Sequence, residues 1–71
     1  NIIGKRRDEA LHETEQYVGG LILKNATEGI IIHGKGTGIL KQMVLDYLKE
    51  NPAIKEFKVS NDGGATLFKF K

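Results

Sequence analysis

The 71-residue chain contains no cysteine and no tryptophan, and it has a single proline. Without cysteine, neither a disulfide bond nor a thiolate metal site can stabilise so short a chain, so its core must come from helices packed on a sheet. No apolar run approaches the ~18 residues that a membrane helix requires, and no signal-peptide pattern opens the chain. We therefore expect a cytoplasmic domain that has no membrane partner.

An excess of charge of one sign is also absent. The 11 Lys and Arg residues face 9 Asp and Glu residues, which gives a net charge of +2 and an isoelectric point of about 9.0. This bias is weaker than that of a dedicated polybasic arm, so the positions of the cations matter more than their sum. The carboxylates show no spacing that a metal site or an acid/base pair would require, and we predict no metal-binding residues.

The apolar patterns predict one α/β domain over residues 1–71. Amphipathic helices are predicted at 7–24 and 38–50, the second ended by Asn51 and Pro52, and strands at 1–3, 29–33, 53–60 and 65–71. The strand at 29–33 is apolar at nearly every position, which predicts burial on both of its faces. The sequence NDGG at 61–64 predicts a hairpin between the last two strands.

This order of elements predicts a two-layer β-α-β-α-β-β sandwich. Crossovers between parallel strands are right-handed in ~98% of cases, so both helices should cover the same face of a four-stranded mixed sheet. The last strand should run antiparallel to the others. Because the chain starts with Asn1, within an apolar run, we also expect a domain excised from a longer protein.

Two basic turns follow the first two predicted strands, at residues 4–7 and 33–38. If these strands are parallel neighbours, both turns leave the same edge of the sheet, where α/β proteins bind ligands. Helix N-termini at this edge attract anions, and the cations there would add to that attraction. The sequence therefore predicts a phosphate-bearing ligand, held by Lys5, Arg6, Arg7, Lys35 and Lys41.

The second turn has three glycines at alternate positions, Gly34, Gly36 and Gly38. Their spacing matches neither the dinucleotide fingerprint nor the P-loop. A tight turn explains one or two of them, whereas three suggest that a bulky phosphate approaches the backbone amides of this turn. His33 has two open interpretations, a histidine hydrogen-bonded into the core or a general acid/base.

The segments GKRRDEALHETEQYV and IIHGKGTGIL, with the later GG, resemble the Smr (small MutS-related) domain, in particular the one that ends bacterial MutS-like recombination-suppressor proteins. The resemblance covers essentially the whole chain, and the H-G-x-G-x-G motif at 33–38 is its most specific part. It implies the fold given above with strand order 1-2-4-3. It also implies a nucleic-acid-binding, nicking endonuclease, monomeric as an isolated domain and dimeric in its parent protein through other domains.

If the domain cleaves nucleic acid, the candidate catalytic residues are His33 as acid/base and Lys35 as the group that stabilises transition-state charge. A divalent cation, Mg or Mn, is compatible with this chemistry, although no site for it is recognisable. The predicted nucleic-acid-binding residues are Lys5, Arg6, Arg7, Gly34, Lys35, Gly36, Thr37, Gly38 and Lys41.

A second family motif, L-D-x-x-G, departs from its pattern here. Aligning its glycine with Gly4 places Asn1 where the aspartate would be, and asparagine cannot act as a general base. Two functions are therefore open. One is a structure-preferring endonuclease on branched or nicked DNA that suppresses homologous recombination in the parent protein, and the other is a non-enzymatic module for structured RNA or stalled and collided ribosomes.

Overall fold

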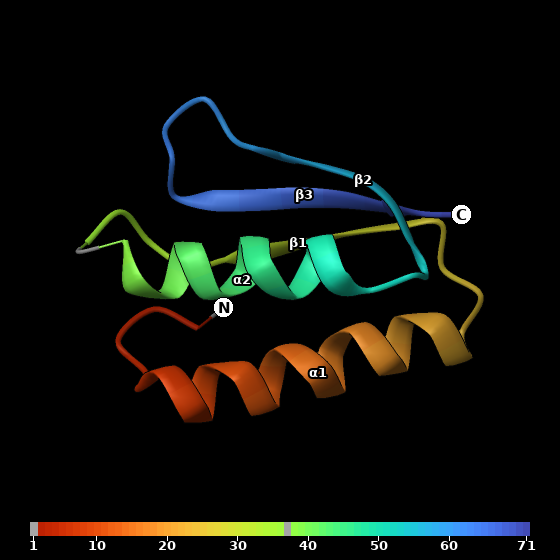
Figure 1. Ribbon diagram of the computed structural model, residues 1–71, viewed down its shortest axis with the longest axis horizontal. Coiled ribbons are helices and arrows are strands. Elements are labelled where there is room, and N and C mark those ends of the chain that lie inside the picture. Colours follow the sequence, from red (N-terminus) through yellow and green to blue (C-terminus); the bar gives the residue numbers. More distant parts are fainter. Residues whose placement is uncertain (1, 37) are drawn as a thin grey trace.

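A computed structural model describes residues 2–36 and 38–71 as two layers, two helices against a sheet (Figure 1). The helices lie side by side and both contact the sheet on the same face. This α/β class agrees with the prediction from the sequence. In chain order the elements are α1 (Arg7–Leu23), β1 (Glu28–Ile32), α2 (Ile39–Glu50), β2 (Ile54–Val59) and β3 (Ala65–Phe70).

The sheet has the order β1-β3-β2, and its central strand β3 runs antiparallel to both neighbours. The predicted strand at residues 1–3 does not appear among the strands. Ile2 donates its N–H to the Ile32 carbonyl at 2.9 Å, but Gly4 then turns the chain with a φ of 82°. The described residues thus form three strands instead of four, so the predicted order 1-2-4-3 is not confirmed. Asn1 lies outside the described residues.

The core lies between the helices and the inner face of the sheet. Phe68 at its centre is 1% exposed and meets the rings of Tyr17 and Phe70 edge-on, at centroid distances of 6.4 and 5.5 Å. Fully burying a side chain of this kind contributes roughly 1.5–3 kcal/mol. Both helices, the sheet and the N-terminal segment supply the other large buried apolar residues, which are Ile2, Val18, Ile31, Met43, Val44, Leu48 and Ile54.

The outer face of the sheet is not covered by any described element. On β1 the side chain of Ile31 is 2% exposed, whereas Ile30 and Ile32 are 45% and 38% exposed. The prediction that this strand is buried on both faces was therefore wrong. The alternation of an antiparallel edge strand is present, but isoleucine occupies its outward positions as well.

The two ends of the molecule differ in what they carry. The turns at 3–6, 33–36 and 60–64 all lie at the left end in Figure 1. The C-terminal Lys71 lies at the opposite end, where its N–H donates to the Ala53 carbonyl at 3.0 Å. In the described part of the chain, neither helix has the length and apolar character needed to cross a membrane.

Candidate functional site

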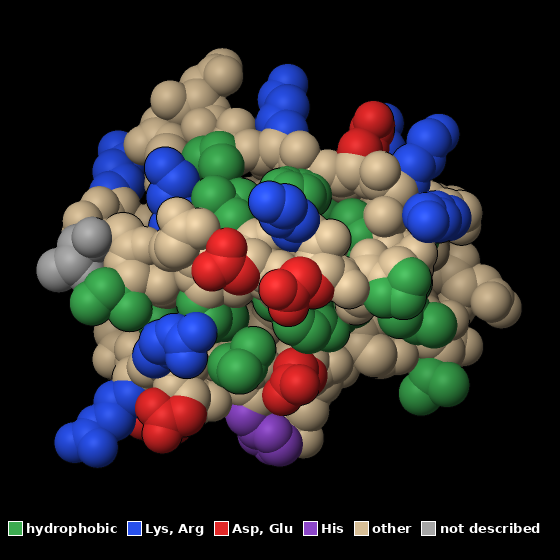
Figure 2. Space-filling view, viewed as in Figure 1, with side chains coloured by type: hydrophobic (Ala, Val, Ile, Leu, Met, Phe, Trp, Pro, Cys, Tyr) green, Lys and Arg blue, Asp and Glu red, His purple; other side chains and the backbone are tan. Residues whose placement is uncertain are grey.

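The two basic turns meet in one groove of about 490 Å³, between the first turns of α1 and α2. This confirms the predicted proximity of residues 4–7 and 33–38 in the part that is described. Figure 2 shows Lys and Arg side chains around this left end of the molecule. No Asp or Glu side chain is among the described residues that line the groove, and its five cations are Lys5, Arg6, Arg7, Lys35 and Lys41.

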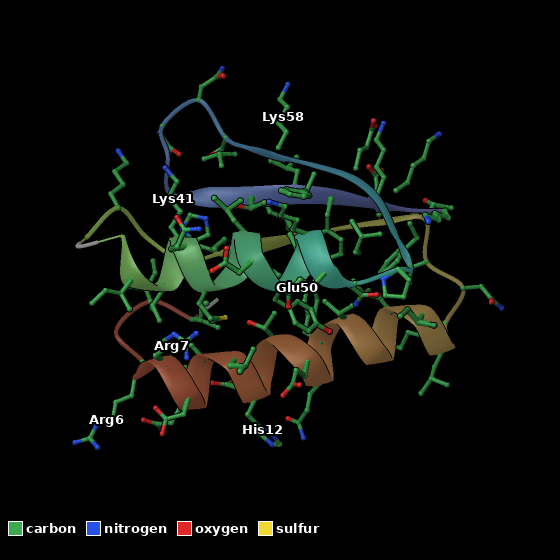
Figure 3. The ribbon with its side chains drawn as sticks, in the orientation of Figure 1. Arg6, Arg7, His12, Lys41, Glu50 and Lys58 are labelled. Atoms are coloured by element: carbon green, nitrogen blue, oxygen red, sulfur yellow. The ribbon has the colours of Figure 1, made fainter. Side chains whose placement is uncertain are left out.

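The cations differ in how they are held. Lys5 pairs with Glu13 at 2.7 Å, and the hydrogen bond from the ammonium to this carboxylate raises the pKa of Lys5 above its usual 10.5. The guanidinium of Arg7 lies between the N-terminal turns of the two helices, whereas Arg6 points away from α2 (Figure 3). Glu13 thus compensates the charge of Lys5, and the positive potential of the groove comes mainly from the other four cations, which form no ion pair with described residues.

The turn that contains Gly34 and Gly36, called the glycine turn below, is hydrogen-bonded to the β2–β3 hairpin. The amides of His33 and Gly34 both donate to the Gly64 carbonyl, at 3.1 and 2.9 Å. Gly34 has a φ of 80°, and a Cβ at this position would lie 3.2 Å from Ile3 Cγ1. The amide of Gly34 is therefore already engaged, whereas the backbone N–H groups of Lys35 and Gly36 have no hydrogen-bond partner among the described residues.

Helix α2 begins directly after this turn. Its N-cap is Gly38, with a φ of 85°, and no side chain of a described residue caps the helix. Its first turn contains no acidic residue, in contrast to that of α1, where Asp8 and Glu9 are present. The positive end of the α2 dipole is therefore not compensated by side chains of its own first turn.

His33 lies at the floor of the groove and is only 4% exposed. Its Nδ1 is 2.9 Å from the Gly34 carbonyl oxygen, and its Nε2 is 2.9 Å from Thr66 Oγ1. A carbonyl can only accept, so Nδ1 carries a proton, and in the neutral ring Nε2 accepts from the Thr66 hydroxyl. Both ring nitrogens are thus used inside the protein.

The structure brings almost all of the predicted binding residues to the groove. They are Lys5, Arg6, Arg7, Gly34, Lys35, Gly36, Gly38 and Lys41, whereas Thr37 lies outside the described residues. Gly64 and Thr66, which hold the turn and the imidazole, were not predicted as site residues. Gly64 ends the hairpin signal and Thr66 lies two residues after it, and nothing in the local pattern shows that they reach a turn some 30 positions earlier.

Candidate metal ligands do not gather in the described part of the chain. None of its His, Asp and Glu side chains form a group of three or more that could hold a metal ion. The groove itself carries cations, which repel a metal ion unless an anionic ligand arrives with it. Residues 2–36 and 38–71 therefore do not form a metal centre by themselves.

Comparison with known proteins matches residues 1–69 to the Smr domain. Over 72 residues the chain is 46% identical to the endonuclease MutS2 of Pediococcus pentosaceus and 43% identical to that of Latilactobacillus sakei. Each alignment covers 96% of this chain and 9% of the relative, so the chain spans about a tenth of the length of these relatives.

The fold has a close structural counterpart. The crystal structure of the Smr domain of Thermus thermophilus MutS2 superposes with a TM-score of 0.91 at 26% identity, covering 99% of this chain and 92% of the other. Family match, sequence identity and fold agree, and the chain belongs to the Smr domain family.

Proposed function

We propose that this domain binds the phosphate backbone of nucleic acid in the basic groove and nicks one strand there. The observation that carries the proposal is the gathering of five cations around one groove that no described carboxylate lines. A polyanion releases counterions when such cations neutralise its phosphates, which favours binding. The amides of Lys35 and Gly36 and the N-terminus of α2 add hydrogen-bond donors and positive potential.

Phosphodiester hydrolysis needs little beyond positioning and charge stabilisation. The oxygen of water forms a bond to phosphorus, the bond from phosphorus to the sugar oxygen breaks, and one proton passes from the water to the sugar oxygen overall. We assign Lys35 to stabilise charge on the phosphoryl oxygens. His33 is the candidate for proton transfer. Both of its ring nitrogens are hydrogen-bonded inside the protein, so one of them must give up its bond to Thr66 or Gly34 before it can contact the substrate.

Contacts to the backbone carry no base identity, so we expect recognition of shape instead of sequence. Branched or nicked DNA presents more than one phosphate path to a groove of this kind. The relatives from Pediococcus pentosaceus and Latilactobacillus sakei are named endonucleases, which supports nuclease chemistry for the family. In a parent protein that dimerises through other domains, cleavage of branched DNA would suppress homologous recombination.

A second function is favoured by the environment of His33. A histidine that is 4% exposed and hydrogen-bonded at both nitrogens is suited to hold a turn in place. In this alternative the domain is a non-enzymatic module that docks on structured RNA or on a stalled ribosome through the same cations. Asn1, which replaces the family's aspartate, favours the same alternative.

The two functions are separated by assaying nicking of supercoiled plasmid and of a labelled four-way DNA junction with magnesium, manganese or a chelator. The variants are His33→Gln, which retains polar atoms for Gly34 and Thr66, and His12→Ala, which removes the exposed imidazole on the outer side of α1 (Figure 3). We expect wild type and His12→Ala to nick the DNA, and His33→Gln to bind the junction but lose at least about a hundredfold in rate.

Binding without nicking by the wild type under all three conditions would support the docking module instead. No binding to DNA or RNA at low salt would exclude both functions. Thermal melting of each variant checks that a lost activity does not come from unfolding.

A further inference from the structure

Three aliphatic side chains line the same groove as the cations. Leu40 packs against the core, whereas the other two, Ile3 and Ile39, are exposed. Ile3 precedes the first basic turn, and Ile39 is the first residue of α2. Each is 56% exposed, whereas the core isoleucine Ile31 is 2% exposed. A phosphate is strongly polar and makes no favourable contact with an aliphatic side chain. Binding of a sugar-phosphate backbone alone therefore does not account for two exposed isoleucines in the groove.

The position of Ile3 links the groove to the uncovered face of the sheet. A Cβ at Gly34 would be 3.2 Å from Ile3 Cγ1, so this side chain lies directly over the glycine turn. A second hollow, of about 830 Å³, begins at Ile3, Gly34 and Lys35 and continues along Ile30 and Ile32. Positive charge and apolar surface are therefore adjacent at the turn.

A nucleotide combines these two properties, because its phosphate is anionic and the face of its base is largely apolar. In a continuous duplex the base faces are covered by stacking, so aliphatic side chains can reach them only where a step is opened. Isoleucine is one of the residues that proteins insert between base steps for this purpose. The positive charge of the groove thus favours nucleic acid as the ligand, and its exposed aliphatic side chains favour contact with an unstacked base.

We propose that Ile3 and Ile39 contact an unstacked base of the bound nucleic acid, while Lys35 and its neighbouring cations hold the adjoining phosphates. This inference rests on the proposed binding of nucleic acid in the groove, and it adds the residues that discriminate an opened step from a continuous duplex. It does not depend on whether the strand is cut.

The test uses fluorescence anisotropy with two labelled DNA duplexes of equal length, one continuous and one with a three-nucleotide bulge that contains 2-aminopurine. The variants are the double substitution Ile3→Ala with Ile39→Ala and, as a control, Leu23→Ala. Leu23 is 86% exposed at the far end of α1 and does not line the groove. Each substituted residue is more than half exposed, so we expect the fold to be retained.

We expect the wild type and Leu23→Ala to bind the bulged duplex about fivefold more tightly than the continuous one and to change the 2-aminopurine fluorescence. The double variant should bind both duplexes equally, with its affinity for the continuous duplex and the salt dependence of that affinity unchanged.

An equal preference for the bulged duplex in the double variant, or none in the wild type, would overturn the inference and leave the proposed binding intact. A change in the oligomeric state of the double variant, with its DNA preference intact, would also overturn it and assign the two residues to self-association. Failure of the wild type to bind either duplex would overturn the proposed binding as well.

Discussion

At the scale of single residues, His33 shows how neighbouring groups restrict chemistry. Its hydrogen bonds join the glycine turn, through the Gly34 carbonyl, to β3, through the Thr66 hydroxyl. Thr66 is fully buried, so each partner depends on the other to avoid an unsatisfied polar group. Of the two interpretations that the sequence left open, the hydrogen-bonded core histidine describes this conformation, and its part in catalysis stays a prediction.

Asp62 performs a similar task at the hairpin. Its Oδ1 accepts from the Gly64 amide at 2.9 Å and from Ser60 Oγ at 2.7 Å, and these bonds lower the pKa of Asp62 below its usual 3.8. A carboxyl whose pKa is lower in the folded state stabilises the fold above its unfolded pKa. This contribution is lost as the pH falls through the folded pKa.

We therefore expect Asp62→Ala to lower the melting temperature at pH 7, and the difference from wild type to shrink as the pH falls below 3.8. Thermal melts followed by circular dichroism between pH 7 and pH 2 measure this difference. Asp46→Ala, which removes an exposed carboxylate from α2, is the control. A difference that stays constant down to pH 2 would contradict the assignment.

At the scale of elements, two glycines with opposite surroundings test the packing of α1 on the sheet. A Cβ at Gly29 of β1 would lie 2.6 Å from Phe68 Cζ and 2.7 Å from Leu21 Cδ1, whereas a Cβ at Gly20 of α1 would meet nothing within 4 Å. Gly29 thus allows the helix and the sheet to approach each other closely, and Gly20 has no packing role.

Gly29→Ala should lower the free energy of unfolding by about 1–3 kcal/mol through overpacking. Gly20→Ala should raise it by up to ~1 kcal/mol, since alanine favours the helix. Urea denaturation of both variants beside wild type gives the two values. A Gly29→Ala variant as stable as wild type would show that Phe68 and Leu21 both move aside without cost.

Most elements were predictable because each has a local cause. The helix at Arg7–Leu23 follows its apolar spacing in spite of Gly19 and Gly20, and the hairpin follows NDGG. What failed depended on distant partners. The exposed outer face of β1 could not be inferred from a run of isoleucines. Whether the segment at Ile2 forms a strand depends on its backbone hydrogen bonds to Ile32 and its neighbours, which the local sequence does not specify.

The charged residues of the candidate site could be predicted from the sequence, whereas the hydrogen bonds that hold its turn and its imidazole could not. The positive charge of Lys5 and Lys35 follows directly from their residue type, and the order of elements is enough to bring their turns together. The pairing of His33 with Thr66 and of Gly34 with Gly64 depends on the register of β1 on β3, which no local pattern specifies.

At the scale of the whole molecule, the net charge is only +2, yet five of the 11 Lys and Arg residues line one groove. Cations on the sheet, such as Lys58 in Figure 3, lie away from Arg7 and do not line the groove. The difference between the two positions provides a matched pair of substitutions with the same change in net charge.

We expect Lys35→Ala to weaken binding to duplex DNA and to reduce the slope of log affinity against log salt by about 0.9, the value for one phosphate contact. Lys58→Ala should leave the slope unchanged. Anisotropy titrations between 50 and 200 mM salt, a range of about fourfold, resolve this difference. Equal slopes for both variants would mean that net charge, and not the groove, governs binding.

The first and the last described residues lie in very different relations to the groove. Ile3 lines the groove directly after the buried Ile2, whereas Lys71 is hydrogen-bonded at the opposite end of the molecule. A dye, affinity tag or surface tether attached after Lys71 would leave the groove open to a large polyanion. The C-terminus is thus the natural attachment point for immobilised or single-molecule assays of this domain.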